Sequence, residues 1–141
     1  MRSTLLLPAL YLGLAAIARA SEPHSQEQLE FFERKVRPLL AEHCHSCHSA
    51  ETKPAGGLRV DDRNGLIAGG NTGPAIVPGQ VEKGNLLRRI SHADAKRRMP
   101  PEGEALTPEQ VAVLAKWIRD GVAWPGSNIP STLGKARPEY E

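Results

Sequence analysis

The sequence predicts a fold of helices joined by turns, without β-strands, and three observations support this prediction. Apolar residues recur at helical spacing in three stretches, at 26–42, 81–90 and 107–120. The region between the first two stretches is punctuated by glycine and proline, from Lys53-Pro54 to Pro78-Gly79, which indicates turns. Capping patterns also mark the beginnings of the first and last helical stretches.

Residues 1–20 are typical of a secretory signal peptide. Arg2 supplies the positive n-region, Leu5 to Ile17 form an apolar h-region, and Ala18-Arg19-Ala20 form an A-x-A cleavage site. The apolar run is too short to span a bilayer comfortably, so we expect export and no stable membrane span after cleavage; an uncleaved anchor is the alternative. Two arginines and no acid would leave with the signal. The remaining chain is then nearly neutral, which gives no indication of a nucleic-acid partner.

The first helix is predicted after a polar lead-in at 21–27. Ser25 and Gln28 have the spacing of a capping box, in which each side chain bonds the backbone N–H of the other residue. Pro38 is expected to end this helix and to start a short second one that leads to Cys44. The apolar positions of this stretch are Phe31, Phe32, Val36, Leu39 and Leu40.

Two short helices are predicted in the turn-rich middle of the chain. Asp61 or Asp62 can cap a helix that ends at Gly69. Another helix is expected near Val81 to Ile90, and residues 92–101 are expected to form a loop.

The last helix is predicted to begin at Thr107 and to end at Gly121. Pro108 stands in its first turn, and Gln110 completes a second capping box with Thr107. We expect one domain at 28–125, poor order from Trp124 onward, and a flexible tail at 126–141.

The segment from His43 to His48 contains both cysteines of the chain. Cys44, Cys47 and His48 form the Cys-x-x-Cys-His signature of covalent c-type haem attachment. Two thiols at this spacing can each form a thioether with one vinyl group of the same porphyrin. The histidine that follows then becomes the proximal iron ligand.

Three other interpretations of this segment make demands on the rest of the chain. A zinc site needs four ligands, yet the sequence offers no second cysteine pair and only His92 downstream. A thioredoxin-like redox pair follows a β-strand, whereas the residues before Cys44 predict a helix. A disulfide between Cys44 and Cys47 would close a very small loop and stabilise little of the chain. We therefore favour haem attachment over a thiol or metal module.

Met99 is the candidate for the second iron ligand, because Met1 would leave with the signal. Pro100-Pro101 restrict the backbone after it, and a thioether opposite His48 would stabilise ferrous iron. A methionine that fills a gap in the core is the alternative role.

Three histidines are rival ligands. His43 and His45 lie too close in sequence to the attachment cysteines to reach the other side of the haem. His92 is therefore the main rival of Met99.

These motifs resemble those of the class I cytochromes c and, more narrowly, the cytochrome c-like domain of large secreted planctomycete proteins. The resemblance covers Gln28 to Pro125. Its segments are Phe31–Leu40, Gly56–Asp61, Gly73–Gly79, Met99–Pro101 and Trp117–Gly121, together with the haem motif. The planctomycete proteins usually continue into much larger domains, so we expect this chain to be either a free-standing carrier or a fragment.

The resemblance implies an all-α, class I cytochrome c-like fold with about four to five short helices around one covalently attached haem c. The first and last helices should cross, with Phe31 or Phe32 against Trp117.

The resemblance also implies a set of site residues. Cys44 and Cys47 would carry the haem, and His48 and Met99 would bind its iron. Thr72-Gly73-Pro74 also resembles the class I loop whose proline carbonyl, here that of Pro74, would accept a hydrogen bond from the proximal imidazole, although an ordinary turn is the alternative reading of this proline.

The combined pattern predicts an exported mono-haem cytochrome that carries single electrons between periplasmic redox proteins, and not an enzyme. Two axial ligands leave no open position on the iron for substrate chemistry. The alternatives are a haem sensor or small peroxidase with a displaceable Met99, and a non-haem redox or metal module.

A basic group precedes and adjoins Met99 in the sequence. It could be ordinary solvated surface, a docking collar for an acidic redox partner, or a set of partners for the haem propionates. Its members are Arg88, Arg89, Lys96, Arg97 and Arg98.

Overall fold

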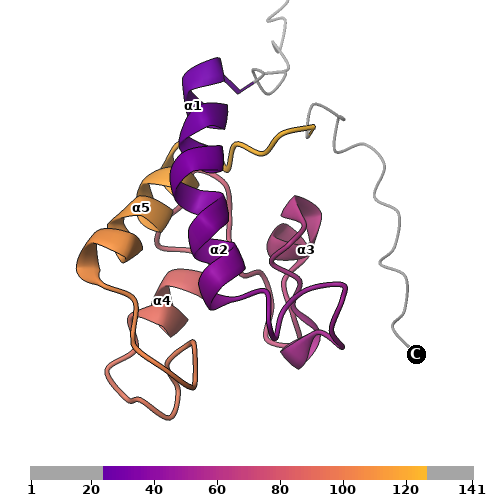
Figure 1. The fold of residues 1–141 in the computed structure, drawn as a ribbon, viewed down its shortest axis with the longest axis vertical. Coiled ribbons are helices and arrows are strands. Elements are labelled where there is room, and N and C mark those ends of the chain that lie inside the picture. Colours follow the sequence, from indigo (N-terminus) through magenta and orange to yellow (C-terminus); the bar gives the residue numbers. More distant parts are fainter. Residues whose placement is uncertain (1–23, 127–141) are drawn as a thin grey trace, which may run out of the picture.

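The computed structural model describes residues 24–126, which form helices joined by turn segments (Figure 1). Within this range there is no β-strand, only an isolated bridge between Gly70 and Gly73. The predicted all-α class is therefore confirmed for the described residues. The predicted signal at 1–20 and nearly all of the predicted tail lie outside them. The helices are α1 (Gln26–Phe31), α2 (Arg37–His43), α3 (Arg63–Ala68), α4 (Leu86–Ile90) and α5 (Pro108–Arg119), with a 3₁₀ turn at Ala55–Gly57.

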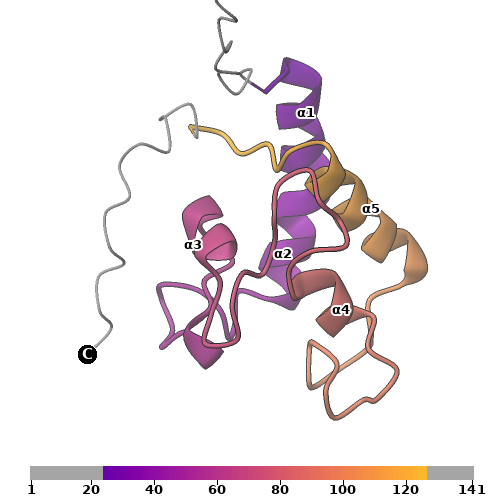
Figure 2. The same ribbon diagram turned by 180° about the vertical axis from the view of Figure 1, so that it is seen from behind.

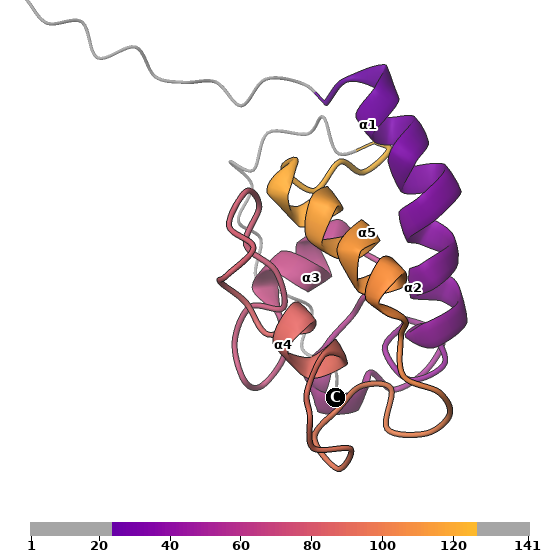
Figure 3. The same ribbon diagram turned by 90° about the vertical axis from the view of Figure 1, so that its left-hand side faces the viewer.

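Helices α1 and α2 form one continuous rod, because a π-helical turn at Phe32–Val36 joins them (Figure 3). The predicted capping box of Ser25 and Gln28 opens the rod. Pro38 stands in the first turn of α2, as expected, but it does not break the rod, so that part of the prediction is wrong. Proline has no N–H to donate to the preceding turn. In the wider π turn the Arg37 N–H donates to the Phe32 carbonyl, and the helix stays continuous although Pro38 lacks an N–H.

Helix α3 agrees with its prediction, whereas α4 is shorter than predicted. The Asp62 side chain caps α3 by accepting a hydrogen bond from the Gly65 N–H at 2.8 Å, and Gly69 ends the helix with φ 75°. Helix α4 begins at Leu86, because the residues before it form turns around Gly84, which has φ 95°. A side chain at Gly84 would place its Cβ 2.5 Å from the Ala75 carbonyl oxygen. This close approach requires glycine and prevents an earlier start of the helix.

Helix α5 begins and ends as predicted. Thr107 and Gln110 form the second capping box, Pro108 occupies the first turn, and Gly121, with φ 98°, follows the end of the helix. The segment between α3 and α4 runs up beside α5 (Figure 2), where the Gly79 N–H donates to the Ile118 carbonyl at 2.8 Å. The long connection is thereby fixed to the last helix.

The core lies where the α1–α2 rod meets α5. Phe32 and Trp117 are almost fully buried, and their ring centroids lie 5.8 Å apart, which confirms Phe32 as the partner at the crossing. The expectation of poor order from Trp124 onward is wrong for Trp124 itself, whose ring centroid lies 4.5 Å from that of Phe32. The reason is a tight return of the chain after α5, in which the Trp117 indole N–H donates to the Ala123 carbonyl at 2.9 Å. The other core side chains at this crossing include Val36, Leu40, Leu114 and Ile118.

None of the helices described here is long and apolar enough to cross a membrane.

Candidate functional site

The cysteine pair lies in a turn that continues from α2. The N–H groups of Cys44 and His45 both donate to the Leu40 carbonyl, at 3.0 and 3.1 Å, and the His48 N–H donates to the Cys44 carbonyl at 3.0 Å. The His48 carbonyl in turn accepts a hydrogen bond from the Val60 N–H at 2.8 Å. Both ends of the five-residue motif are therefore held by backbone hydrogen bonds.

Met99 lies in the loop that connects α4 to α5. Its N–H donates to the Arg89 carbonyl at the end of α4, at 3.0 Å, which ties the loop back to the helix. The Asp94 carbonyl accepts from the N–H groups of Arg97 and Arg98, both at 3.0 Å, and forms the turn before the methionine. The loop is consequently ordered by its own backbone.

One cavity of about 570 Å³ lies between the cysteine turn and the methionine loop. Its volume is within the range of about 300–1,000 Å³ that is usual for small-molecule and cofactor sites. Cys44, Cys47, His48 and Met99 all line it, so four of the five residues predicted from the sequence meet at one place. Apolar side chains form much of the remaining wall: Ala55, Leu58, Val60, Ala75, Leu86, Ile90, Pro100 and Pro101.

The two thiols differ in their surroundings. Both cysteines are free of disulfide bonding; Cys44 is half-buried and Cys47 is exposed. Burial raises the pKa of the Cys44 thiol to about 11, so this sulfur remains a neutral thiol at physiological pH. A neutral thiol in an apolar wall and a second thiol at the solvent edge suit covalent attachment of a flat apolar group.

The Nδ1 atom of His48 is buried and makes no hydrogen bond. It is one of two such side-chain atoms among the described residues. The predicted acceptor is the Pro74 carbonyl, which here accepts the Asn85 N–H at 3.0 Å. Pro74 itself does not line the cavity, although its neighbours Gly73 and Ala75 do. The hydrogen bond between His48 and Pro74 is thus not formed in this structure, and the role of Pro74 stays a prediction.

The three histidines considered as rival iron ligands lie at different places, and not all of them reach the cavity. His92 does not line the cavity, and its Nδ1 accepts the Asp94 N–H at 3.0 Å. His45 faces a separate hollow on the surface, beside Glu51. His43 does line the cavity, and its Nε2 lies 3.4 Å from the Gln110 side-chain nitrogen on α5. Of the candidates considered for the second ligand, Met99 and His43 are therefore the ones that reach the cavity.

The polar part of the cavity wall was predicted only in part, in the loop that contains Thr72. Asn71, Thr72 and Asn85 line it, and the Asn85 amide donates to the Thr72 carbonyl at 3.0 Å. Close packing of two glycines shapes the same wall, because a Cβ on Gly70 would lie 2.4 Å from the Gly56 carbonyl oxygen. Apart from the resemblance of Thr72-Gly73-Pro74 to the class I loop, the sequence offered the Gly/Pro punctuation, which predicted turns but not which turns meet.

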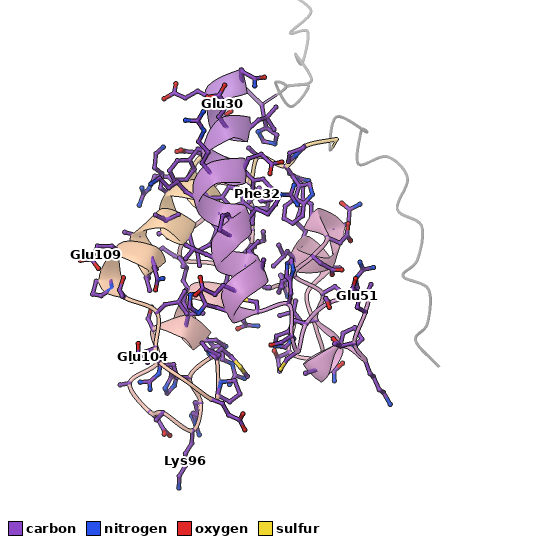
Figure 4. The ribbon with its side chains drawn as sticks, in the orientation of Figure 1. Glu30, Phe32, Glu51, Lys96, Glu104 and Glu109 are labelled. Atoms are coloured by element: carbon purple, nitrogen blue, oxygen red, sulfur yellow. The ribbon has the colours of Figure 1, made fainter. Side chains whose placement is uncertain are left out.

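The five basic residues near Met99 do not form one continuous surface. Arg88, Lys96 and Arg97 are exposed, and Lys96 points away from the body of the protein (Figure 4). Arg89 instead lines the cavity, and the Nε of Arg98 is buried without a hydrogen-bond partner. Two arginines are thus partly withdrawn from solvent next to the predicted ligand.

No cluster of three or more histidine, cysteine, aspartate or glutamate side chains suited to a metal ion occurs between residues 24 and 126.

Comparison with known protein families shows which family part of this chain is similar to. Residues 44–103 match the model of a family described as Planctomycete cytochrome C. The match begins at Cys44 and extends beyond Met99, so it includes most of the cavity wall, while the α1–α2 rod and α5 lie outside it. No curated protein and no solved structure gives a significant match.

Proposed function

We propose that this protein is an exported mono-haem c-type cytochrome that carries single electrons, and the match of residues 44–103 to the family described as Planctomycete cytochrome C supports this. The haem, when bound, supplies a one-electron iron couple. The observation that carries the proposal is the meeting of Cys44, Cys47, His48 and Met99 around one cavity.

The residues present fit a covalently bound haem. The Cys44 and Cys47 sulfurs would bind the haem covalently, and His48 and Met99 would bind its iron. Because the protein would supply both of these iron ligands, electron transfer would be favoured over chemistry on a bound substrate.

The apolar walls of the cavity keep water from most of the site. Side chains such as Leu58, Val60 and Ile90 would surround the porphyrin, and a dry environment favours the less charged ferrous state. The exposed Cys47 marks an edge at which a partner can approach closely enough for electron exchange.

We propose export to the periplasm, with periplasmic redox proteins as donor and acceptor. The support is the signal-like sequence at 1–20, with its positive start, apolar run and A-x-A site. Export also suits the chemistry, because c-type haem in bacteria is attached outside the inner membrane.

The test is a pyridine haemochrome spectrum of protein exported from a host with c-type maturation. A c-type spectrum is expected for the wild type. Met99→Ala should retain the covalent haem but lose the spectrum of histidine–methionine ligation, whereas His92→Ala, the matched control, should leave that spectrum unchanged.

Two other results would redirect the proposal. A c-type spectrum unaffected by Met99→Ala would remove Met99 from the iron and favour His43, His92 or an open site. Colourless protein with two reactive thiols would contradict the cytochrome proposal and support a thiol or metal module.

A further inference from the structure

Arg89 lies at the point where α4 leads into the methionine loop, and its side chain lines the cavity. Its backbone carbonyl accepts the Met99 N–H at 3.0 Å. Among the residues that line the cavity, Arg89 is the one permanently charged cation and Glu102 the one carboxylate. Arg89 therefore puts a positive charge into an otherwise largely apolar site, directly beside the predicted iron ligand.

The guanidinium of Arg89 has more N–H donors than the hydrogen bonds found for it. A guanidinium carries five N–H groups, and the hydrogen bond found for this one is a long contact of 3.4 Å from Nη1 to the Arg97 carbonyl. None of the ion pairs between described residues includes Arg89, although Glu102 borders the same cavity. The guanidinium is therefore available to pair with an anionic group that enters the cavity.

Arg98 precedes Met99, and its Nε is buried without an acceptor, but Arg98 does not line the cavity. A carboxylate is the acceptor that a planar guanidinium binds best. Arg89 is therefore the arginine placed to bind a carboxylate that enters the cavity.

We propose that Arg89 binds a propionate carboxylate of the haem and that this ion pair holds the haem on the α4 side of the cavity. The inference rests on the proposed function, since a haem provides the two propionates. The proposal gives Arg89 a role that the exposed residues Arg88, Lys96 and Arg97 do not have.

The pairing has a consequence for the iron. A fixed positive charge near the porphyrin favours the reduced state, and it also keeps the neighbouring propionate ionised over a wide pH range. Without that charge the propionate would take up a proton more readily, and the uptake would be coupled to reduction of the iron.

The experiment compares the reduction potentials of Arg89→Gln, Arg89→Lys and Lys96→Gln in the haem-loaded protein between about pH 5 and pH 8. Glutamine at Arg89 keeps the backbone carbonyl that holds Met99, and Lys96→Gln removes the same charge from the exposed part of the same loop. Thermal unfolding and the haemochrome spectrum establish that each variant is folded and loaded.

We expect Arg89→Gln to lower the equilibrium constant for reduction about tenfold, which is about 59 mV for a one-electron couple, and to make the potential depend on pH. Arg89→Lys should recover at least half of that shift. Lys96→Gln should change the constant less than about twofold, and this small effect should disappear in high salt because exposed charges are screened.

Equal potentials and equal pH dependence in Arg89→Gln and Lys96→Gln would overturn the inference while leaving the cytochrome proposal intact. If Arg89→Gln binds too little haem to measure, haem content becomes the readout. Recovery of haem content in Arg89→Lys would support the ion pair, and equal loss in both variants would overturn it. Absence of covalent haem from the wild type would instead contradict the proposed function itself.

Discussion

The helix crossing and the cavity differ in how their apolar surfaces are covered. At the crossing the protein covers its own apolar surface: Phe32 is 0% exposed, Trp117 is 1% exposed and Leu114 is 1% exposed. At the cavity, apolar walls enclose about 570 Å³ that the side chains do not fill. The first region can be stable by itself, whereas the second needs a bound group to reach the packing density of a protein interior.

The crossing should account for most of the stability of the protein with or without haem. Phe32→Ala removes a fully buried ring that contacts both tryptophans, and we expect a loss of about 3–5 kcal/mol in the free energy of unfolding. The loss should be the same in haem-loaded and haem-free protein. Urea unfolding measures it.

Phe31→Ala is the matched control for this substitution. The Phe31 ring is only half-buried and lies beside the Lys116 ammonium, 5.1 Å from it. Its truncation should cost clearly less. Equal costs for the two substitutions would mean that the crossing is not the centre of stability.

Truncation of the cavity wall should depend on haem. Leu58 is half-buried and lines the cavity, so Leu58→Ala should cost about 2–5 kcal/mol in the haem-loaded protein and less in the haem-free protein. Without haem the side chain has fewer neighbours to lose. Leu114→Ala, on the packed side of α5, should show no such difference between the two forms. A haem-independent cost at Leu58 would show that the cavity closes by itself.

The two cysteines should differ in reactivity before haem is attached. In haem-free protein at pH 8 we expect iodoacetamide to modify Cys47 at least about tenfold faster than Cys44, because the thiolate is the reactive form. Burial raises the pKa of Cys44 to about 11, so its rate should continue to rise with pH up to that value.

Single-cysteine variants, Cys44→Ser and Cys47→Ser, separate the two rates. If Cys44 reacts as fast as the exposed Cys47 at pH 8, the cysteine turn opens readily in solution and the buried environment of Cys44 is not maintained without haem.

The smallest effect is expected at a helix end. Thr107→Ala removes the side chain that accepts the Gln110 N–H at the start of α5, which should cost about 1 kcal/mol. Because α5 belongs to the crossing, the cost should be the same with and without haem. Thermal unfolding of both forms measures it, and a cost confined to one form would link the helix end to the cavity.

Local features of the fold could be predicted from the sequence because they depend on neighbouring residues. The capping boxes at Ser25 and Thr107, the Asp62 cap and the ends of the helices at Gly69 and Gly121 are all determined within one turn of chain. The five-residue haem motif is local in the same sense.

The errors arose where contacts distant in sequence decide the structure. The late start of α4 depends on the approach of Gly84 to Ala75, and the order of Trp124 depends on its contact with Phe32. The continuous rod at Pro38 depends on a π turn that apolar periodicity does not reveal. None of these contacts has a signature within its own segment.

The distinction between local features and contacts distant in sequence also applies to the candidate site. That Cys44, Cys47, His48 and Met99 belong to one site could be predicted from motif and residue type, but the position of Arg89 in the cavity wall could not. In the sequence Arg88 and Arg89 are equivalent neighbours. Only the structure shows that Arg88 is exposed while Arg89 is half-buried and lines the cavity.

The most direct test of the central claim, that the cavity is built to be completed by one covalent haem, is the mass of the intact exported protein. We predict the mass of the polypeptide plus one haem, retained under denaturing conditions and lost when Cys44 and Cys47 are both replaced by alanine. The mass of the bare polypeptide, from cells that load other c-type cytochromes normally, would contradict the account.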